Sequence, residues 1–249
     1  MPASERPADA VRLVDALAGH PVVVFDLDGV IVDSNELKVD CVREVFAQYP
    51  PELVEEFTAE FRRTFGRSRR DHFAAFHAAG ARRGLAGPDP QEFHDRYAGA
   101  YAALLAQRYR RAPLCAHAGE LIAELSARGL PLHVATGTLT AEAVGVLDAA
   151  GLLGAFDSVL GGEEPKSRRL GQILEYSGAA PADAVLVGDS RQDVLAADAA
   201  GTDFVLVTRY GFFPPEQVLH DRSGRAARFV TDLDPRGPVR ELATAGGRP

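Results

Sequence analysis

The strongest constraint on the fold is a regular alternation of strand and helix patterns that begins at Pro113. Short apolar runs, typical of buried parallel strands, each precede a longer pattern with helical spacing. We expect strands at 131–135, 156–160, 184–187, 203–207 and 229–233, helices at 119–128, 139–150, 166–177 and 191–200, and a weaker helix from Val239. This alternation predicts an α/β fold, in which right-handed crossovers build a doubly wound, mostly parallel sheet.

One more strand is expected much earlier, at Val22–Phe25, after a short amphipathic helix at 11–17. This run of β-branched and aromatic residues leads straight into Asp26 and Asp28. Two carboxylates just past the end of a buried strand repel each other unless a cation offsets their charge. A divalent cation with oxygen ligands would do so, and the carboxyl ends of parallel strands are where such sheets bind ligands. A plain Asp-Gly turn that ends the strand is the alternative.

The intervening residues 35–111 show no strand pattern. Helices are expected there at 35–48, 52–63, 71–79 and 92–110, with Ser34 as the first N-cap and breaks at Pro50, Pro51, Pro88 and Pro90. We therefore expect a core domain made of residues 1–33 and 113–249, with a helical domain of residues 34–112 inserted into it.

Composition bounds the class of protein. With 249 residues, of which 46% are hydrophobic and 25% charged, the chain is typical of a soluble globular protein. No apolar run is long enough to span a bilayer, and the polar segment Met1–Asp9 lacks the pattern of a signal peptide. Cys41 and Cys115 lie far apart without CxxC spacing, so they suggest neither a disulfide framework nor a zinc site. We expect a cytoplasmic protein without a membrane partner.

The net charge of −8 argues against general binding to nucleic acids. Residues 34–112 hold 13 Lys and Arg against 11 Asp and Glu, a balance of +2, which leaves −10 for the rest of the chain. Only Lys38 and Lys166 are lysines among the 27 basic residues, so the location of each lysine is informative.

Further polar residues follow the other expected strands. Thr136 and Gly137 come directly after one strand, Lys166 follows the loop after the next, and Asp189 and Asp193 follow a third. A hydroxyl and backbone N–H groups at a helix start can hold phosphate oxygens, a lysine suits a phosphate, and the two aspartates can complete a magnesium site. Singly, each has a plainer explanation as a helix cap or as a solvated charge near a helix start. Their occurrence in order, each after a strand, favours one shared site.

These segments resemble the motifs of the haloacid dehalogenase-like phosphohydrolase superfamily, specifically of members with a small helical cap after the first strand. Residues 26–34 match its first motif, DxDGxxxDS, and residues 188–193 match its fourth, GDSxxD. Thr136 corresponds to the second motif and Lys166 to the third. One departure is visible, because residues 164–167 read Glu-Pro-Lys-Ser where relatives often show Gly-Lys-Pro.

The resemblance implies a role for each matched residue. Asp26 is implied as the nucleophile that forms an aspartyl-phosphate, and Asp28 as the general acid and base. The implied cofactor is Mg²⁺, held by the Asp26 carboxylate, the Asp28 backbone carbonyl and Asp189, with Asp193 in or next to the coordination shell. The remaining motif residues, Thr136, Gly137 and Lys166, are implied to hold the transferring phosphoryl group.

The helical cap is implied to set substrate choice. Residues 66–71 resemble a cap loop that reaches the active site in phosphoglycolate phosphatase-like and β-phosphoglucomutase-like relatives, which makes Arg69 the first candidate for a substrate contact and Arg67 the second. Solvated arginines at a helix start are an equally good explanation. His72 and His77 are spaced poorly for a metal pair, and the segment 209–215 could border the site or a dimer contact.

Three functions fit these residues. The first is a Mg²⁺-dependent phosphatase for a small phosphorylated metabolite, such as a sugar, a cyclitol or a phosphoglycolate-like acid, acting as a monomer or homodimer. The second is a β-phosphoglucomutase-like phosphomutase, and the third, disfavoured by the intact Asp26 and Asp28, is a non-catalytic metabolite-binding protein. Dehalogenases of the superfamily lack a carboxylate at the position of Asp28, and Lys38 lies too close to the first motif to match the Schiff-base lysine of phosphonate hydrolysis.

Overall fold

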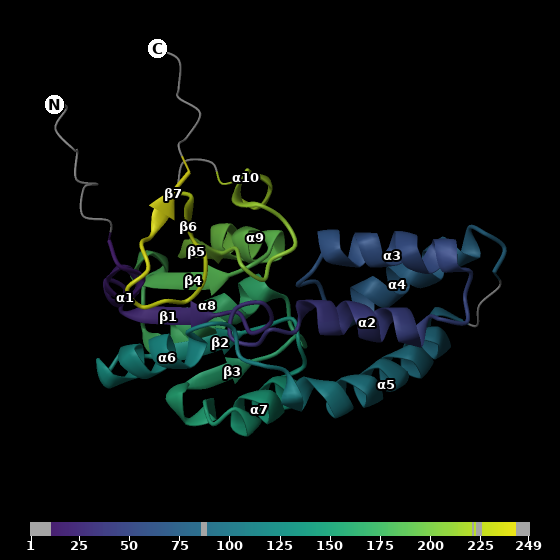
Figure 1. The fold of residues 1–249 in the computed structure, drawn as a ribbon, viewed down its shortest axis with the longest axis horizontal. Coiled ribbons are helices and arrows are strands. Elements are labelled where there is room, and N and C mark those ends of the chain that lie inside the picture. The colour runs from purple at the N-terminus through teal and green to yellow at the C-terminus, as the bar shows by residue number, and fades with distance from the viewer. Residues whose placement is uncertain (1–10, 86–88, 221, 223–225, 243–249) are drawn as a thin grey trace, which may run out of the picture.

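A single sheet forms the centre of the computed structural model, which describes residues 11–85, 89–220, 222 and 226–242. The described strands are β1 (Val22–Phe25), β2 (Leu132–Ala135), β3 (Ser158–Leu160), β4 (Ala184–Gly188), β5 (Asp203–Val207), β6 (Arg228–Val230) and β7 (Arg240–Glu241). They pair in the order β3-β2-β1-β4-β5-β6-β7 (Figure 1). All pairs are parallel except β6 with β7, so the predicted α/β fold with a mostly parallel sheet is confirmed.

Helices cover both faces of this sheet because alternate residues of a strand point in opposite directions. They are α1 (Leu13–Ala18), α6 (Ala118–Ala127), α7 (Thr140–Ala149), α8 (Lys166–Ser177), α9 (Arg191–Ala200) and the short α10 (Pro215–Val218). In β1, Val23 and Phe25 pack in one apolar cluster with residues of α1, α6 and α7. Val22 and Val24 belong to a second cluster with residues of α8 and α9. The strand is therefore apolar throughout, as the sequence predicts for a strand buried on both sides.

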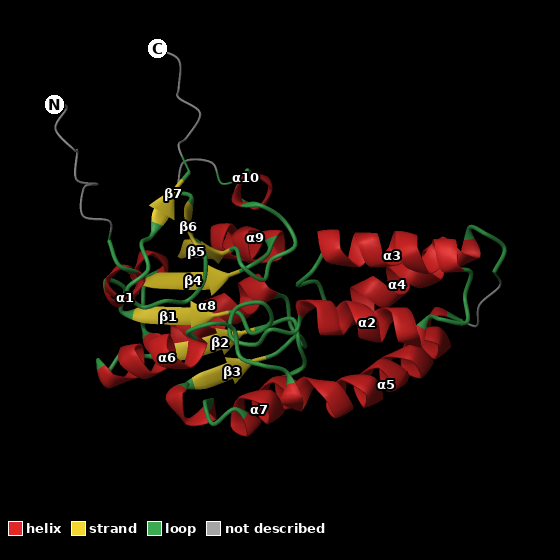
Figure 2. Cartoon of the chain, in the orientation of Figure 1, coloured by secondary structure: helices red, strands yellow, loops and turns green. Residues whose placement is uncertain are grey.

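The chain between β1 and α6 forms the helical insert, which consists of α2 (Asn35–Val45), α3 (Pro51–Arg63), α4 (Arg69–Ala81), α5 (Pro90–Arg108) and a 3₁₀ turn, η1 (Tyr109–Arg111). No strand occurs among its described residues, and Figures 1 and 2 show its helices beside the sheet, beyond the carboxyl end of β1. Its interior is aromatic. Phe46 is fully buried there, stacked on Phe76 with ring centroids 3.9 Å apart and packed edge-on against Phe73 at 5.3 Å.

Several sequence expectations about local structure need correction. The strands expected at 156–160 and 229–233 are shorter, because β3 begins at Ser158 and β6 ends at Val230. The helix expected from Val239 is instead the strand β7, whose backbone pairs antiparallel with β6 at the edge of the sheet. The third insert helix begins at Arg69 rather than Asp71, because the Ser68 hydroxyl accepts a hydrogen bond from the Asp71 N–H and caps it. The first insert helix, α2, ends at Val45, earlier than expected. The segment Met1–Asp9 and Pro88 lie outside the described residues.

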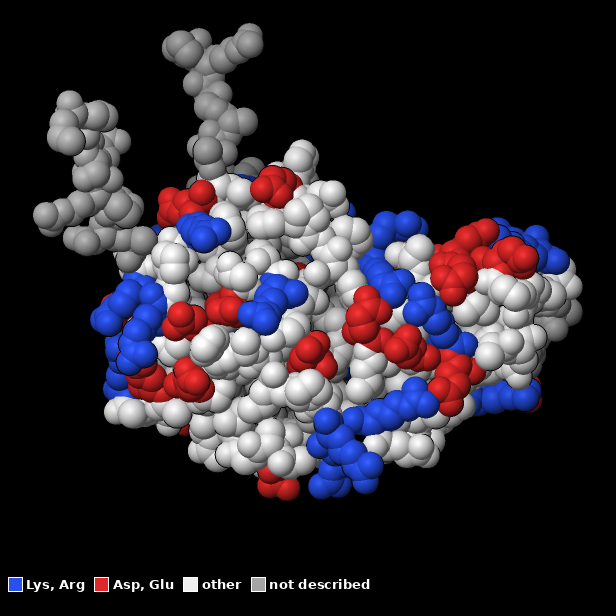
Figure 3. Space-filling model, viewed as in Figure 1, with Lys and Arg blue, Asp and Glu red and all other residues white. Residues whose placement is uncertain are grey.

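The charges on one face of the molecule are of mixed sign. On the face in Figure 3, acidic and basic side chains are interspersed over the sheet domain and over the helical insert. None of the described helices combines the length and apolar composition that a membrane span requires.

The aromatic interior of the insert can be tested with Phe46→Ala. Removing a fully buried ring leaves a cavity, and we expect the free energy of unfolding to fall by about 3–5 kcal/mol in urea denaturation. Tyr176→Ala is the control, since the Tyr176 side chain is 78% exposed and its removal should change that free energy by less than about 0.5 kcal/mol. Equal effects of the two substitutions would contradict this account of the core.

Candidate active site

Three aspartates converge at the carboxyl ends of β1 and β4. These strands are parallel neighbours, in register from Val22 and Ala184 onward, so the residues that follow them leave the sheet at the same edge. Asp26 follows β1 and donates its N–H to the Val187 carbonyl at 2.8 Å, while Asp189 follows β4. Carboxylate oxygens of Asp26, Asp189 and Asp193 all lie within 4.8 Å of one another, and all three residues are buried. The expected convergence of the first and fourth motifs therefore occurs in the structure.

The electrostatics of this cluster fit a divalent cation. Burial raises the pKa of the Asp26 carboxyl, Lys166 opposes this effect, and the nearby charges of Asp193 and Asp28 add to it, so that the pKa lies at about 6. Burial, and then the charges of Asp193 and Asp26, raise the pKa of Asp189 well above its ordinary value. Oδ1 of Asp189 accepts no hydrogen bond from any described residue, and neither does Oδ1 of Asp26, although Lys166 Nζ lies 2.8 Å from it. Crowded, undersatisfied carboxylate oxygens are the donor set that Mg²⁺ prefers.

Asp193 differs from the other two aspartates in that both of its carboxylate oxygens accept hydrogen bonds. Its Oδ2 accepts hydrogen bonds from the N–H groups of Asp189 and Ser190 at 3.2 and 3.0 Å, and from the Ser190 hydroxyl at 2.6 Å. Its Oδ1 accepts a hydrogen bond from the Lys166 ammonium. Because both oxygens are already engaged, Asp193 fixes the loop after β4 and the position of Lys166. This arrangement fits a place beside the coordination shell, the second of the two alternatives that the sequence leaves open.

Two residues that the sequence motifs do not assign shape the same cluster. Asn35, at the start of α2, donates from Nδ2 to Asp189 Oδ2 at 2.6 Å and to the Tyr210 carbonyl at 2.9 Å. Gly29 has a φ of 73°, and a Cβ at this position would lie 2.1 Å from Asp189 Oδ2. A side chain is therefore excluded there both by backbone conformation and by space, which explains the glycine of the first motif.

Asp28 lies apart from the aspartate cluster and is held by four donors. Its Oδ1 accepts hydrogen bonds from the hydroxyls of Ser34 at 2.6 Å and Tyr109 at 2.7 Å. Its Oδ2 accepts hydrogen bonds from Lys38 Nζ at 2.5 Å and from the Thr138 hydroxyl at 2.8 Å. Burial alone would raise the pKa of Asp28, but the Lys38 charge and these hydrogen bonds outweigh it and hold the pKa below its usual value. Asp28 is therefore an ionised carboxylate with both oxygens engaged.

Ser34 is thus only partly what the sequence predicts. It occupies the N-cap position of α2, but its side chain caps no backbone N–H of that helix. Its hydroxyl donates to Asp28 and also lies 3.2 Å from the Val32 carbonyl. A buried carboxylate is a stronger acceptor than a backbone carbonyl, so the hydroxyl turns toward the charge.

The predicted phosphate-binding loop follows β2 and lies next to Asp26 and Asp28. Gly137 and Thr138 line the same cavity as these two aspartates, and Thr136 directly before them is fully buried. Gly137 lies against the insert, since a Cβ on it would come within 3.0 Å of the Gly66 carbonyl. The buried Arg169, one turn after Lys166 in α8, donates to the Thr136 carbonyl. Arg169 therefore holds this loop through its backbone. The sequence did not indicate this role, because Arg169 lies in a helix that contains two arginines.

The insert closes a small cavity, of about 50 Å³, over this edge of the sheet. The two predicted cap arginines, Arg67 and Arg69, both line it. Arg69 already has partners, because its Nη2 lies 2.9 and 2.7 Å from the two carboxylate oxygens of Glu142 in α7 and its guanidinium lies over the Tyr101 ring. It joins the insert to the sheet domain, whereas no described residue forms a salt bridge with Arg67.

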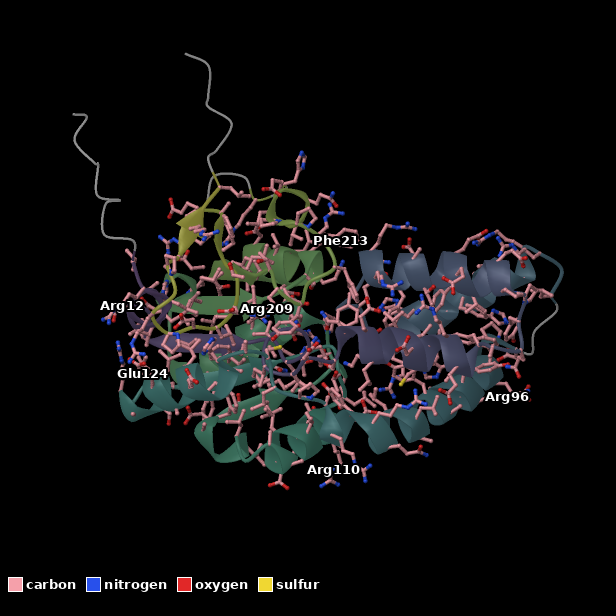
Figure 4. All side chains as sticks on the ribbon, viewed as in Figure 1. Arg12, Arg96, Arg110, Glu124, Arg209 and Phe213 are labelled. Carbon is pink, nitrogen blue, oxygen red and sulfur yellow. The ribbon has the colours of Figure 1, made fainter. Side chains whose placement is uncertain are left out.

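His72 and His77 do not form a metal pair among the described residues. His72 lines the cavity and is buried, which lowers its pKa to about 4, so its ring is neutral at pH 7. The ring of His77 packs against Phe93. The loop after β5, which the sequence left open, lies beside the insert: Phe212 packs against Phe65, and Figure 4 shows Phe213 on the side of this loop that faces α3.

Comparisons with known proteins agree with this fold. The sequence model of the haloacid dehalogenase-like hydrolases matches residues 23–207. A phosphoglycolate phosphatase from Mesorhizobium japonicum is 30% identical over 197 residues, which are 76% of this chain and 82% of that protein. A solved hydrolase from Pseudomonas syringae has a TM-score of 0.66 at 19% identity, over 80% of this chain and 89% of that one. CbbY from Rhodobacter sphaeroides, solved with xylulose-1,5-bisphosphate, has a TM-score of 0.63 at 20% identity, over 86% and 95%.

The raised pKa of Asp26 predicts a pH dependence of stability in EDTA. A carboxyl whose pKa is raised by folding stabilises the protein below its unfolded pKa, and this contribution is lost as the pH rises through the folded value. We compare the free energy of unfolding of the wild type with that of Asp26→Asn. With a folded pKa of about 6, the wild type should lose about 2.4 kcal/mol relative to the variant between about pH 4 and pH 7. A difference that stays constant over this range would contradict the assignment.

Magnesium should reverse this destabilisation. We expect Mg²⁺ at about 100 times its Kd to stabilise the wild type by about 2.7 kcal/mol in thermal denaturation. Asp189→Asn, which removes a charged oxygen ligand of the cluster, should lose most of this gain, while Asp148→Asn, an exposed carboxylate on α7, should keep it. Equal stabilisation of all three proteins would place the cation elsewhere.

Proposed function

The chain belongs to the haloacid dehalogenase-like hydrolases and is an enzyme of their phosphatase type, and on this premise we propose that it is a Mg²⁺-dependent phosphomonoester hydrolase for a small phosphorylated metabolite. One observation carries the proposal: Asp26, Asp189 and Lys166 meet at one edge of the sheet, beside a separately held Asp28. A protein that only bound a metabolite would have no use for a nucleophile and an acid–base carboxyl lining one cavity.

In the first half of the reaction, an Asp26 carboxylate oxygen attacks the phosphorus and forms an aspartyl-phosphate. Asp28 is ionised in the protein without substrate. The negative charge of the bound phosphate ester favours uptake of a proton from solvent by Asp28, and the leaving oxygen takes this proton when the ester P–O bond breaks. Lys166, which contacts Asp26 at 2.8 Å, and the N–H groups after Thr136 are placed to hold the phosphoryl oxygens. In the second half, water attacks the phosphorus, gives its proton to Asp28 and releases phosphate from Asp26.

The Asp26 and Asp189 carboxylates, together with the backbone carbonyl of Asp28, would hold the Mg²⁺, and Asp193 would stand beside it. When bound, the cation supplies positive charge that offsets the repulsion between the attacking carboxylate and the phosphate. Asn35 supports this site through its hydrogen bond to Asp189 Oδ2. The fit rests on the undersatisfied oxygens of Asp26 and Asp189.

The helical insert acts as a cap in this proposal and contributes part of the lining of the substrate site. The cationic side chains of Lys38 and Arg67 in this lining favour an anionic phosphate ester. A phosphoglycolate-like acid fits this description, and the relative from Mesorhizobium japonicum carries the name phosphoglycolate phosphatase. We keep Arg67 as a substrate contact, while Arg69 contributes through its bond to Glu142.

Phosphate release by wild type and Asp26→Asn tests the proposal. We expect the wild type with Mg²⁺ to release inorganic phosphate from at least one compound in a screen of phosphorylated metabolites, without a bisphosphate activator. Asp26→Asn should lower kcat by about 10⁴-fold or more, because the amide is a poor nucleophile, while its circular dichroism spectrum stays unchanged. Asp148→Asn, on the exposed face of α7, serves as the control with wild-type rates.

The same assay separates hydrolysis from phosphoryl transfer within the substrate. A phosphomutase keeps the phosphoryl group on the sugar, so isomerised sugar phosphate without free phosphate would replace the hydrolase assignment by the mutase. Wild-type rates in Asp26→Asn would refute the nucleophile.

A further inference from the structure

Lys38 occupies a position in the active site that the motifs of the family leave unassigned. It is one of only two lysines in the sequence, and both reach the same edge of the sheet. Lys166 contacts Asp26 and Asp193 from α8, whereas Lys38 contacts Asp28 from α2 of the insert. Each of the two carboxyl groups that we place in the reaction therefore has its own ammonium partner.

The contacts of Lys38 show that its ammonium group is held in place. The side chain is only 9% exposed, and its Nζ lies 2.5 Å from Asp28 Oδ2. The ammonium also donates to the Thr138 hydroxyl and lies 5.0 Å from the centroid of the Tyr109 ring. Burying an ammonium group is costly unless it is paired and hydrogen-bonded, so these contacts explain why the side chain stays inside the protein.

Lys38 differs from the other donors to Asp28 in charge. Ser34 and Tyr109 both donate to Oδ1, and Thr138 shares Oδ2 with Lys38. Only Lys38 among these four brings a positive charge, and it lines the cavity together with Thr138, Asp26 and Asp28.

We propose that Lys38 is a positioning residue for the proton transfers of Asp28, an inference that rests on the proposed function. Asp28 first takes up a proton from solvent when the anionic substrate is bound. When an Asp26 oxygen bonds to phosphorus, the ester P–O bond breaks and its electron pair stays on the leaving oxygen, which takes this proton from the Asp28 carboxyl group. Lys38 keeps its own protons, aims the Asp28 carboxyl group and stabilises the carboxylate that remains. That carboxylate then accepts a proton from the water that hydrolyses the aspartyl-phosphate.

The dependence of rate on the leaving group tests this role. We measure kcat/KM for a series of ring-substituted phenyl phosphates. This constant reports the steps from free enzyme and substrate to the departure of the phenol, and it does not depend on the hydrolysis of the aspartyl-phosphate. Acidic phenols leave without a proton, whereas less acidic phenols need one. Lys38→Met should therefore lower kcat/KM about tenfold or more for phenyl phosphate and little for the ester of the most acidic phenol. Arg43→Met, on the exposed side of the same helix, removes one positive charge as the matched control and should leave all rates unchanged.

A uniform loss across the series would overturn the proposal, because a residue that only bound substrate or supported the fold would affect every ester alike. Lys38→Met leaves Asp28 buried without its counter-charge and can fail to fold, so a second comparison uses Asp28→Asn as the background, in which the double variant buries neither of the two charges. Adding Lys38→Met to Asp28→Asn should change kcat/KM by less than about twofold on any ester that the wild type hydrolyses, since Lys38 acts through Asp28. A further large loss in the double variant would overturn the proposal.

The two proposals fail in distinguishable ways. If the wild type with Mg²⁺ releases phosphate from no ester at all, the proposed function is wrong and the role of Lys38 falls with it. If the wild type is active and Asp26→Asn is inactive, but loss of Lys38 affects all phenyl phosphates equally, the function stands and the inference about Lys38 alone is wrong.

Discussion

The buried carboxylates at one edge of the sheet repel one another, and the structure around them must offset this repulsion. Four of them lie there, contributed by Asp26, Asp28, Asp189 and Asp193. Lys166 and Lys38 offset part of this charge, each by direct contact with a carboxylate oxygen. The positive charges compensate Asp28 fully, since its pKa is lowered. They do not compensate Asp26 and Asp189, whose pKa values stay raised. The residual negative charge therefore concentrates between β1 and β4, where a cation can bind.

This difference divides one small cavity into two chemical environments. A carboxylate with undersatisfied oxygens beside a cation site is suited to attack phosphorus, and Asp26 is in that state. A carboxylate held by four donors has a fixed direction, which suits Asp28 for exchanging a proton with a neighbouring oxygen. Two carboxyl groups separated by a single residue thus have pKa values shifted in opposite directions by their neighbours, although their own chemistry is the same.

Much of the fold follows from local sequence patterns, and so does the part of the site that lies at strand ends. The sequence could predict that Asp26, Asp189 and Lys166 lie close together, because parallel strands end at a common edge of the sheet. The helix expected from Val239 was wrong because its residues complete the edge of the sheet, a distant pairing that helical propensity does not reflect. Tyr109 could not be predicted as a partner of Asp28, since it lies 81 positions further along the chain and only the folded insert brings the two residues together.

The chain passes twice between the sheet domain and the insert, and at each passage a hydroxyl group donates a hydrogen bond to the same carboxylate oxygen. Ser34 stands where the chain enters the insert and Tyr109 where it returns, and both hydroxyls donate to Asp28 Oδ1. Lys38, one helical turn into the insert, adds a bond to Oδ2. The orientation of the Asp28 carboxylate therefore depends on the insert keeping its place over the sheet, whereas the Asp189 carboxylate needs only Asn35 from it. Substitutions that loosen the insert should for this reason affect proton transfer before they affect the cation site.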